Sequence, residues 1–165
     1  MKIGEENPLV NLLDSEENPL NNVQEEIPFE VVLDSGAAEH VSDSVDAPGY
    51  AVEASEGSKA GKGFIAANGG RIPNKGQMTL SLKTEGNQKI QSTFQVCGTN
   101  RPLWSVAKIC DSGCSVTFDA KQAVVTQKAT GKQVCSFQRQ GGLYVASLML
   151  SKPDGASSFT RQGRR

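Results

Sequence analysis

The stretch VVLDSGAAEH, residues 31 to 40, is an apolar run that ends abruptly at a carboxylate. Strand-forming residues precede Asp34 and small residues follow it, so a buried strand delivers a charged side chain at its end. Gly36 and the alanines after it let another segment of backbone approach closely, and the Gly36 N–H can bond to the carboxylate. We predict an Asp held rigidly at the base of a cleft. The alternative is an Asx-type turn that only ends a strand.

Most of the remaining chain is predicted to form short strands. Apolar residues alternate with polar ones over 78–82 and 90–96, a pattern typical of half-buried antiparallel sheet. Asn68-Gly69 between two apolar runs predicts a hairpin over 64–72, with a type I′ turn as its expected tip. Residues 42–61, small and acidic, are predicted to form a loop. Further strands are expected at 29–33, 115–118, 123–126, 133–137 and 143–148.

One short helix is predicted over 106–111. Ser105 is suited to its N-cap, and Gly113 to its C-terminal exit. The helix ends at a second Asp-Ser-Gly tripeptide, residues 111–113. We predict that Asp111 terminates the helix and that Ser112-Gly113 is the helix stop before the next strand. Many short strands with one short helix predict a mostly-β, barrel-like domain.

The two ends of the chain differ from this central region. Residues 1–26 are acidic and contain the imperfect repeat EENPL, at 5–9 and again at 16–20. We expect a flexible segment there, with a docking or self-cleavage sequence as the alternative. The domain is predicted to span 27–150. Residues 151–165 are rich in Ser, Gly and Arg and are expected to form a disordered basic tail.

Composition excludes several classes of function. The 165 residues carry 17 Lys and Arg against 18 Asp and Glu, so no bulk field favours nucleic acid or acidic membranes. No apolar run is long enough to span a bilayer and no signal peptide is evident, so an intracellular, cytoplasmic protein without a membrane partner is expected. The chain has a single histidine and no CxxC pair, so we expect no metal, no cofactor and reduced thiols. The four thiols belong to Cys97, Cys110, Cys114 and Cys135.

Three stretches of the sequence together resemble one protein family. VVLDSGAAEHV resembles the active-site motif of retropepsin-like aspartic proteases, specifically those of copia-type retrotransposon polyproteins, in which a His follows shortly, as His40 does here. FIAANGGRIPNKGQMTLSL resembles the flap hairpin of that family. VCGTNRPLWSVAKICDSGCSVTFD resembles its second half, with Ser105 where many relatives carry Gly. The resemblance covers Pro28 to Leu148, and the three motifs occur in the family's order.

The resemblance implies a retropepsin-like closed β-barrel with a flap, acting as an aspartic endopeptidase. Two Asp34 carboxylates, one from each chain of a homodimer, would share a proton and activate a water. Ser35 would brace the two loops across the axis, and the flap would close over a polypeptide substrate, expected to be the protein's own polyprotein. The implied catalytic motif is Asp34, Ser35 and Gly36, and the implied substrate-binding residues are Ala37, Ala38, Ala66, Ala67, Asn68, Gly69 and Gly70.

Two further residues and the function itself have alternative interpretations. For His40 we favour a loop or packing role over catalysis, and for Trp104 a core position beneath the active-site loop over ligand binding. The main rival function is a catalytically silent retropepsin-fold module used for dimerisation or peptide binding. A nucleic-acid-binding β-barrel is disfavoured, because the chain lacks a basic stripe interleaved with aromatic residues.

Overall fold

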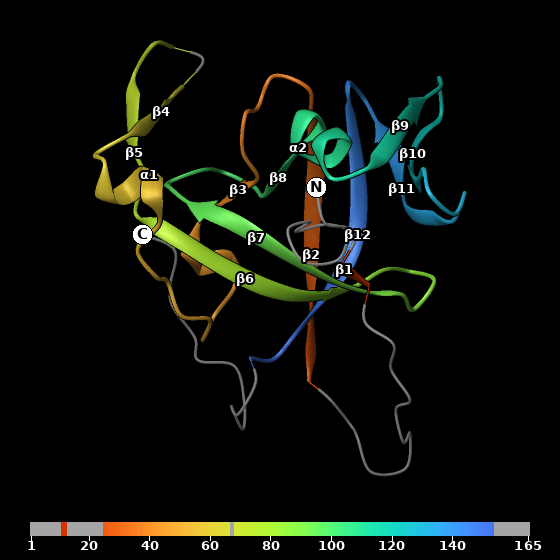
Figure 1. Ribbon diagram of the computed structural model, residues 1–165, viewed down its shortest axis with the longest axis horizontal. Helices are drawn as coiled ribbons and strands as arrows, with labels where there is room; N and C mark the ends of the chain where they lie inside the picture. The colour runs from red at the N-terminus through yellow and green to blue at the C-terminus, as the bar shows by residue number, and fades with distance from the viewer. Residues whose placement is uncertain (1–10, 13–24, 67, 154–165) are drawn as a thin grey trace.

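The computed structural model describes residues 11–12, 25–66 and 68–153, and these form a mostly-β protein, as predicted (Figure 1). Three short helices accompany the strands: the 3-10 helix η1 (Ser44–Asp46), α1 (Glu56–Lys59) and α2 (Val106–Asp111). The strands are β1 (Asn11–Leu12), β2 (Glu26–Asp34), β3 (Val41–Ser42), β4 (Gly63–Ile65), β5 (Arg71–Pro73), β6 (Gly76–Lys83), β7 (Lys89–Val96), β8 (Leu103–Ser105), β9 (Cys114–Phe118), β10 (Gln122–Gln127), β11 (Gln133–Gln140) and β12 (Leu143–Ser151).

All strands except β4 and β5 belong to one ten-stranded mixed sheet, in the order β1-β7-β3-β8-β2-β12-β11-β10-β9. Because β6 pairs with both β12 and β7, part of this sheet closes into a ring, from which β11, β10 and β9 extend. The strand β2 crosses the middle of the molecule, between β12 on one side and β8 on the other (Figure 1). β4 and β5 form a separate two-stranded hairpin.

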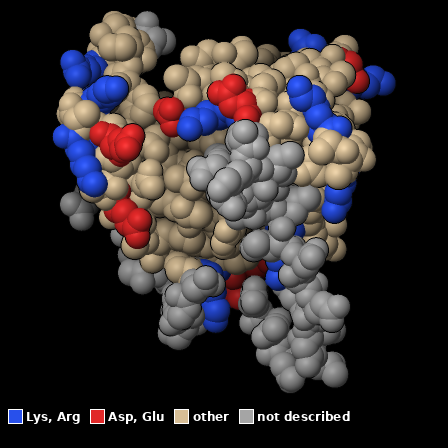
Figure 2. Space-filling model, in the orientation of Figure 1, with Lys and Arg blue, Asp and Glu red and all other residues tan. Residues whose placement is uncertain are grey.

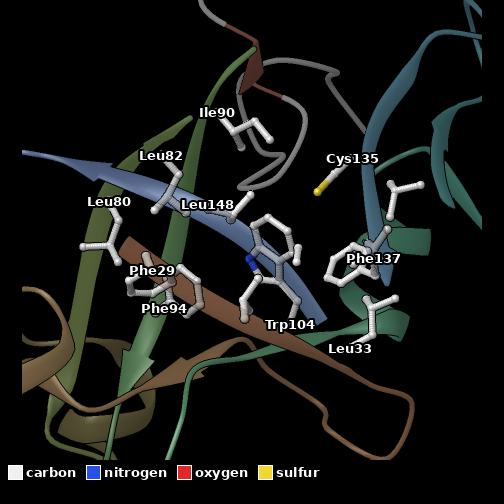
Figure 3. Packing of buried hydrophobic residues seen from close by; sticks show 14 of the residues in the cluster. Phe29, Leu33, Leu80, Leu82, Ile90, Phe94, Trp104, Cys135, Phe137 and Leu148 are labelled. Carbon is white, nitrogen blue, oxygen red and sulfur yellow. The ribbon is translucent and has the colours of Figure 1, made fainter. Parts of the chain in front are cut away.

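The interior of the ring is filled by the alternating apolar residues of its strands. In β6 and β7 every second side chain is buried, and Met78 lies opposite Phe94 across the pair, which confirms the predicted half-buried antiparallel strands. Trp104 is fully buried among Phe94 and Phe137 (Figure 3), and its indole N–H donates to Ser92 Oγ at 2.9 Å. A buried indole with its N–H satisfied suits a core position, so the predicted place of Trp104 is confirmed.

The expectation of a single short helix is wrong. Residues 42–61, predicted to be a loop, contain both η1 and α1. α1 is one turn long and begins at a capping box, in which Ser55 and Ser58 each bond the other's backbone N–H. A helix of four residues buries no apolar face, so hydrophobic periodicity has nothing to detect.

The hairpin tip also differs from its expected geometry. Gly69 N–H donates to Ala66 C=O and Ala66 N–H to Gly70 C=O, each at 2.8 Å. Gly69 has φ +84°, and its bond to Ala66 C=O places it at the end of the turn. A type I′ turn over Asn68 and Gly69 would have Gly69 at its centre, so the tip is the alternative hairpin in which a left-handed Gly follows the turn. The Asn68 side chain accepts the Gly70 N–H instead.

The predicted tails fall largely outside the described residues. Within the segment expected to be flexible, β1 pairs with β7. Residues 1–10, 13–24 and 154–165, and Ala67 in the hairpin, lie outside the part of the chain that the structure describes. Apart from β1, the regular elements run from Glu26 at the start of β2 to Ser151 at the end of β12.

Candidate active site

Asp34 is the last residue of β2, a strand whose preceding residues Val31 to Leu33 are buried. Its side chain is half-exposed, so the carboxylate leaves the core at the end of the strand. Gly36 N–H donates to Asp34 Oδ1 at 2.8 Å, as the sequence suggested. A Cβ at position 36 would lie 3.3 Å from that oxygen. Gly36 therefore holds one oxygen of the Asp34 carboxylate, and any larger residue at position 36 would make a tight contact with that oxygen.

The loop after Asp34 is fastened to β8 and α2 through Ser105. β2 and β8 run parallel here, with Asp34 opposite Ser105. Ser105 Oγ donates to Ala37 C=O at 2.6 Å and accepts the Lys108 N–H at 3.1 Å, so one hydroxyl caps α2 and holds the loop. Because the hydroxyl uses both donor and acceptor capacity, the loop and the helix N-terminus are positioned together.

His40 lies at the other end of this loop, with its side chain in the protein interior. Its side chain is 1% exposed, and Nδ1 accepts the Ser105 N–H at 3.0 Å. An accepting Nδ1 requires the neutral ring, with its proton on Nε2. Burial, reinforced by the Lys108 ammonium, lowers the pKa of His40 to about 3. The ring packs beside Phe94 and Trp104, so the described contacts give His40 the packing role that we favoured.

The second Asp-Ser-Gly tripeptide has a different setting. Asp111 is the last residue of α2 and is exposed. Ser112 is the C-cap, and Gly113, with φ +93°, takes the left-handed conformation that commonly ends helices. The predicted helix, its Ser105 cap and its Gly113 exit are confirmed. The Asp111 carboxylate thus belongs to a helix terminus.

Among the remaining predicted site residues, Ala37 and Ala66 are half-buried and Ala67 lies outside the described residues, whereas the others are exposed. Ser35 and Ala38 are exposed beside Asp34. The β4–β5 hairpin stands at the same end of the molecule as the loop after β2 (Figure 1), but no hydrogen bond among the described residues links them. A cavity of about 400 Å³ lies on the flank of β2 and does not include Asp34. Asp34 itself is half-exposed in the single chain.

The thiols and charges indicate no further chemistry at this site. All four cysteines are free, and burial raises the pKa of Cys135 to about 12. Within the described ranges, no three His, Cys, Asp or Glu side chains are grouped to hold a metal ion. Acidic and basic side chains are interspersed on the face in Figure 2. No described helix is long and apolar enough to cross a bilayer.

Sequence reasoning missed two interactions of this site. It assigned Ser105 only a capping role, and it gave His40 no hydrogen-bond partner. Ser105 lies 65 residues or more from both His40 and Ala37 in the chain, so no local pattern reports these bonds. Comparisons of the chain with family models, with curated proteins and with solved structures find no match.

Proposed function

We propose that the protein is an aspartic endopeptidase whose active site is completed by a second copy of the chain. The observation that carries this proposal is the placement of Asp34. Asp34 is the last residue of a buried strand, and Gly36 N–H binds one oxygen of its carboxylate. The loop that follows is joined to the N-terminus of α2 by a hydrogen bond from Ser105. Such fixed positioning is what general acid–base chemistry on a bound substrate requires.

The proposed chemistry uses two Asp34 carboxylates facing each other across a two-fold axis. Like charges in close proximity do not both ionise, so the pair holds one proton. The ionised carboxylate removes a proton from a water molecule placed between them, and that water attacks the scissile peptide carbonyl. The protonated carboxyl group donates to the carbonyl oxygen. As the tetrahedral intermediate collapses, the carboxyl group that took the water's proton donates it to the leaving nitrogen, and the other carboxylate takes a proton back from a hydroxyl of the intermediate. The amine and the new carboxylic acid are released without a covalent enzyme intermediate.

The proposal requires a homodimer because each chain supplies one suitable aspartate. Asp111, which shares the tripeptide, sits at the exposed end of α2, where no strand or clamped loop positions it. The partial ring of strands and the hairpin near the Asp34 end support the finer proposal of a retropepsin-like fold with a flap. A polypeptide, specifically the protein's own polyprotein, is the proposed substrate.

The deciding experiment mixes active and inactive chains. A peptide library and the protein itself serve as substrates, and mass spectrometry follows the cleavage products. Intact chains are mixed with increasing amounts of Asp34→Asn chains under conditions where subunit exchange is demonstrated. Turnover per intact chain should fall with the intact fraction of the mixture, because mixed dimers carry one aspartate and one asparagine.

Chains with Asp111→Asn are the matched diluent. They retain Asp34, so turnover per Asp34-bearing chain should stay constant in that mixture. A statine-type transition-state mimic should inhibit the parent. Absence of hydrolysis under every condition would reject the enzyme assignment and leave the silent-module reading. Hydrolysis that Asp34→Asn chains do not suppress despite exchange would reject the shared site.

A further inference from the structure

Charged residues are distributed unevenly along the chain. Residues 57–84 carry five basic residues and no acidic one: Lys59, Lys62, Arg71, Lys75 and Lys83. Residues 1–24 carry one lysine against five acidic residues: Glu5, Glu6, Asp14, Glu16 and Glu17. The net charge near zero therefore conceals a basic region and an acidic segment, whose opposite charges are suited to mutual recognition.

The fold gathers four of these basic residues around the β4–β5 hairpin. Arg71, at the start of β5, donates through Nη2 to Gly61 C=O at 3.2 Å, so its guanidinium lies against the chain between α1 and β4. Across the hairpin, Asn74 N–H donates to Lys62 C=O at 3.4 Å. Basic side chains line the side of the molecule that carries this hairpin, with acidic ones beside them (Figure 2). We define the hairpin basic surface as Lys59, Lys62, Arg71 and Lys75.

The charges of this surface are not neutralised within the described chain. All four side chains are exposed, and among the described residues none of them forms an ion pair with a carboxylate. Lys83, outside the surface, is by contrast bonded to Glu26 at 2.8 Å. Glu53 and Glu56 are the acidic residues closest in sequence, so four cations face two carboxylates and the surface keeps an excess of positive charge.

An exposed apolar side chain adjoins these cations. Ile65 is 74% exposed, more than any other large hydrophobic residue among those described. It pairs with Arg71 across the hairpin, so the two side chains project from the same face. Phe64 is half-buried, so the described part of the hairpin offers no fully exposed ring on which nucleic-acid bases could stack. A guanidinium beside an aliphatic side chain suits a polypeptide that carries a carboxylate near an aliphatic residue.

The acidic segment of the chain contains such a sequence twice. The pentapeptide EENPL occurs at 5–9 and again at 16–20. Each copy places a pair of glutamates shortly before a proline and a leucine. Two linked copies of one ligand raise the overall affinity when two copies of the surface are present together, as they are in a dimer.

We propose that the hairpin basic surface binds acidic polypeptide and that the repeat EENPL is its ligand. The glutamates contact the cations, and the leucine contacts Ile65. Exposed ion pairs are individually weak, so binding needs several together and weakens as salt is added. The inference rests on the proposed function in taking the protein's own polyprotein as substrate, and it adds that acidic segments of that substrate are selected.

A charge swap tests the surface directly. The full chain carries Asp34→Asn to prevent hydrolysis. Its own repeats are prevented from competing by four further substitutions: Glu5→Gln, Glu6→Gln, Glu16→Gln and Glu17→Gln. Fluorescence anisotropy then measures binding of a labelled synthetic peptide with the sequence of residues 15–22, SEENPLNN, at several salt concentrations.

Reversing two cations should reverse the preference of the surface. Lys62→Glu with Arg71→Glu should raise the dissociation constant of the peptide at least about ten-fold, because two attractive pairs become repulsive. A peptide with Glu16→Lys and Glu17→Lys should bind this variant more tightly than it binds the chain with the native hairpin. Misfolding of the hairpin would weaken both peptides and would not produce this reversal.

Lys128→Glu with Lys132→Glu is the matched control. Both lysines are exposed between β10 and β11, on the other side of the molecule from the β4–β5 hairpin (Figure 1), so the net charge changes equally while the hairpin is untouched. At about 0.15 M salt this control should bind SEENPLNN within about two-fold of the native hairpin, because charges beyond about 8 Å are screened. Near-ultraviolet circular dichroism of buried Trp104 checks that every variant is folded.

The outcomes separate the surface from the proposed function. Absence of peptide binding at low salt, or an equal loss in the hairpin variant and its control, overturns the surface. A single-stranded oligonucleotide of equal charge that binds the hairpin more tightly than the peptide overturns the choice of polypeptide as ligand.

Hydrolysis by the chain with Asp34 intact gives the remaining distinction. Peptides with EENPL should have a lower KM than peptides with QQNPL, at similar kcat, because the surface binds substrate without touching the reacting atoms. Binding without hydrolysis would retain the surface and reject the protease. Hydrolysis with equal KM for both peptides would retain the protease and reject the surface.

Discussion

The chain contains the tripeptide Asp-Ser-Gly twice, and its two copies have different environments. Asp34 ends the buried strand β2, and Gly36 binds its carboxylate without adopting a positive φ. Asp111 is exposed at the end of helix α2, and Gly113 has φ +93° to turn the chain toward β9. In the first copy the glycine lets the backbone come close to the Asp34 carboxylate. In the second copy the glycine adopts a left-handed backbone conformation. The preceding element, rather than the tripeptide, determines what the aspartate can do.

The strongest test of this comparison removes each carboxylate in turn. Asp34→Asn should lower peptide hydrolysis by at least about 100-fold, the low end of general acid–base contributions. Asp111→Asn should change it less than about two-fold, since surface substitutions away from special features have small effects. Both rates are measured above the dimer dissociation constant. Similar losses in the two variants would mean that the tripeptides are not distinguished as we argue.

The second test uses pH, because only the first tripeptide lies over a buried histidine. The folded pKa of His40, about 3, is below the usual value of 6.5, so the unfolded chain binds the proton more readily. This contribution to stability is complete above pH 6.5 and is lost as pH falls toward 3. The free energy of unfolding should decrease by up to about 1.4 kcal/mol per pH unit in that window.

His40→Asn provides the control for this slope. An Asn oxygen accepts the Ser105 N–H but does not titrate, so urea unfolding between pH 6 and 4 should depend less on pH than in the parent. The carboxylates of the protein titrate in both chains and cancel in the difference. An equal slope in both chains would show that His40 is not buried in its neutral form.

The smallest expected effects separate the two glycines. Gly113→Ala places a Cβ in a left-handed conformation and should cost about 1–2 kcal/mol of stability, measured by urea unfolding. Gly36→Ala brings a Cβ to 3.3 Å from Asp34 Oδ1, so turnover should fall several-fold while stability changes by less than about 0.5 kcal/mol. If Gly36→Ala lost stability and Gly113→Ala lost turnover, the two roles would be reversed.

The sequence predicted those elements that are marked by a local pattern, such as alternating apolar residues or a capping residue. Alternation identified β6 and β7, and the Ser105 cap with Gly113 fixed both ends of α2. It did not reveal α1, which buries no apolar face. It also did not reveal the parallel pairing of β2 with β8, because partner choice depends on the whole sheet. The hydrogen bond from Ser105 to the Asp34 loop and the acceptor role of His40 follow from that pairing. They could not be predicted from the sequence for the same reason.

The position of β2 has a consequence for the order of events during synthesis. Its two neighbours in the sheet, β8 and β12, end at Ser105 and Ser151, whereas β2 ends at Asp34. A growing chain therefore presents Asp34 long before the strands that hold it have left the ribosome. Contacts between distant parts of the chain also make folding slow. If the protein processes its own polyprotein, cleavage begins only after translation has passed β12, so incomplete chains are spared.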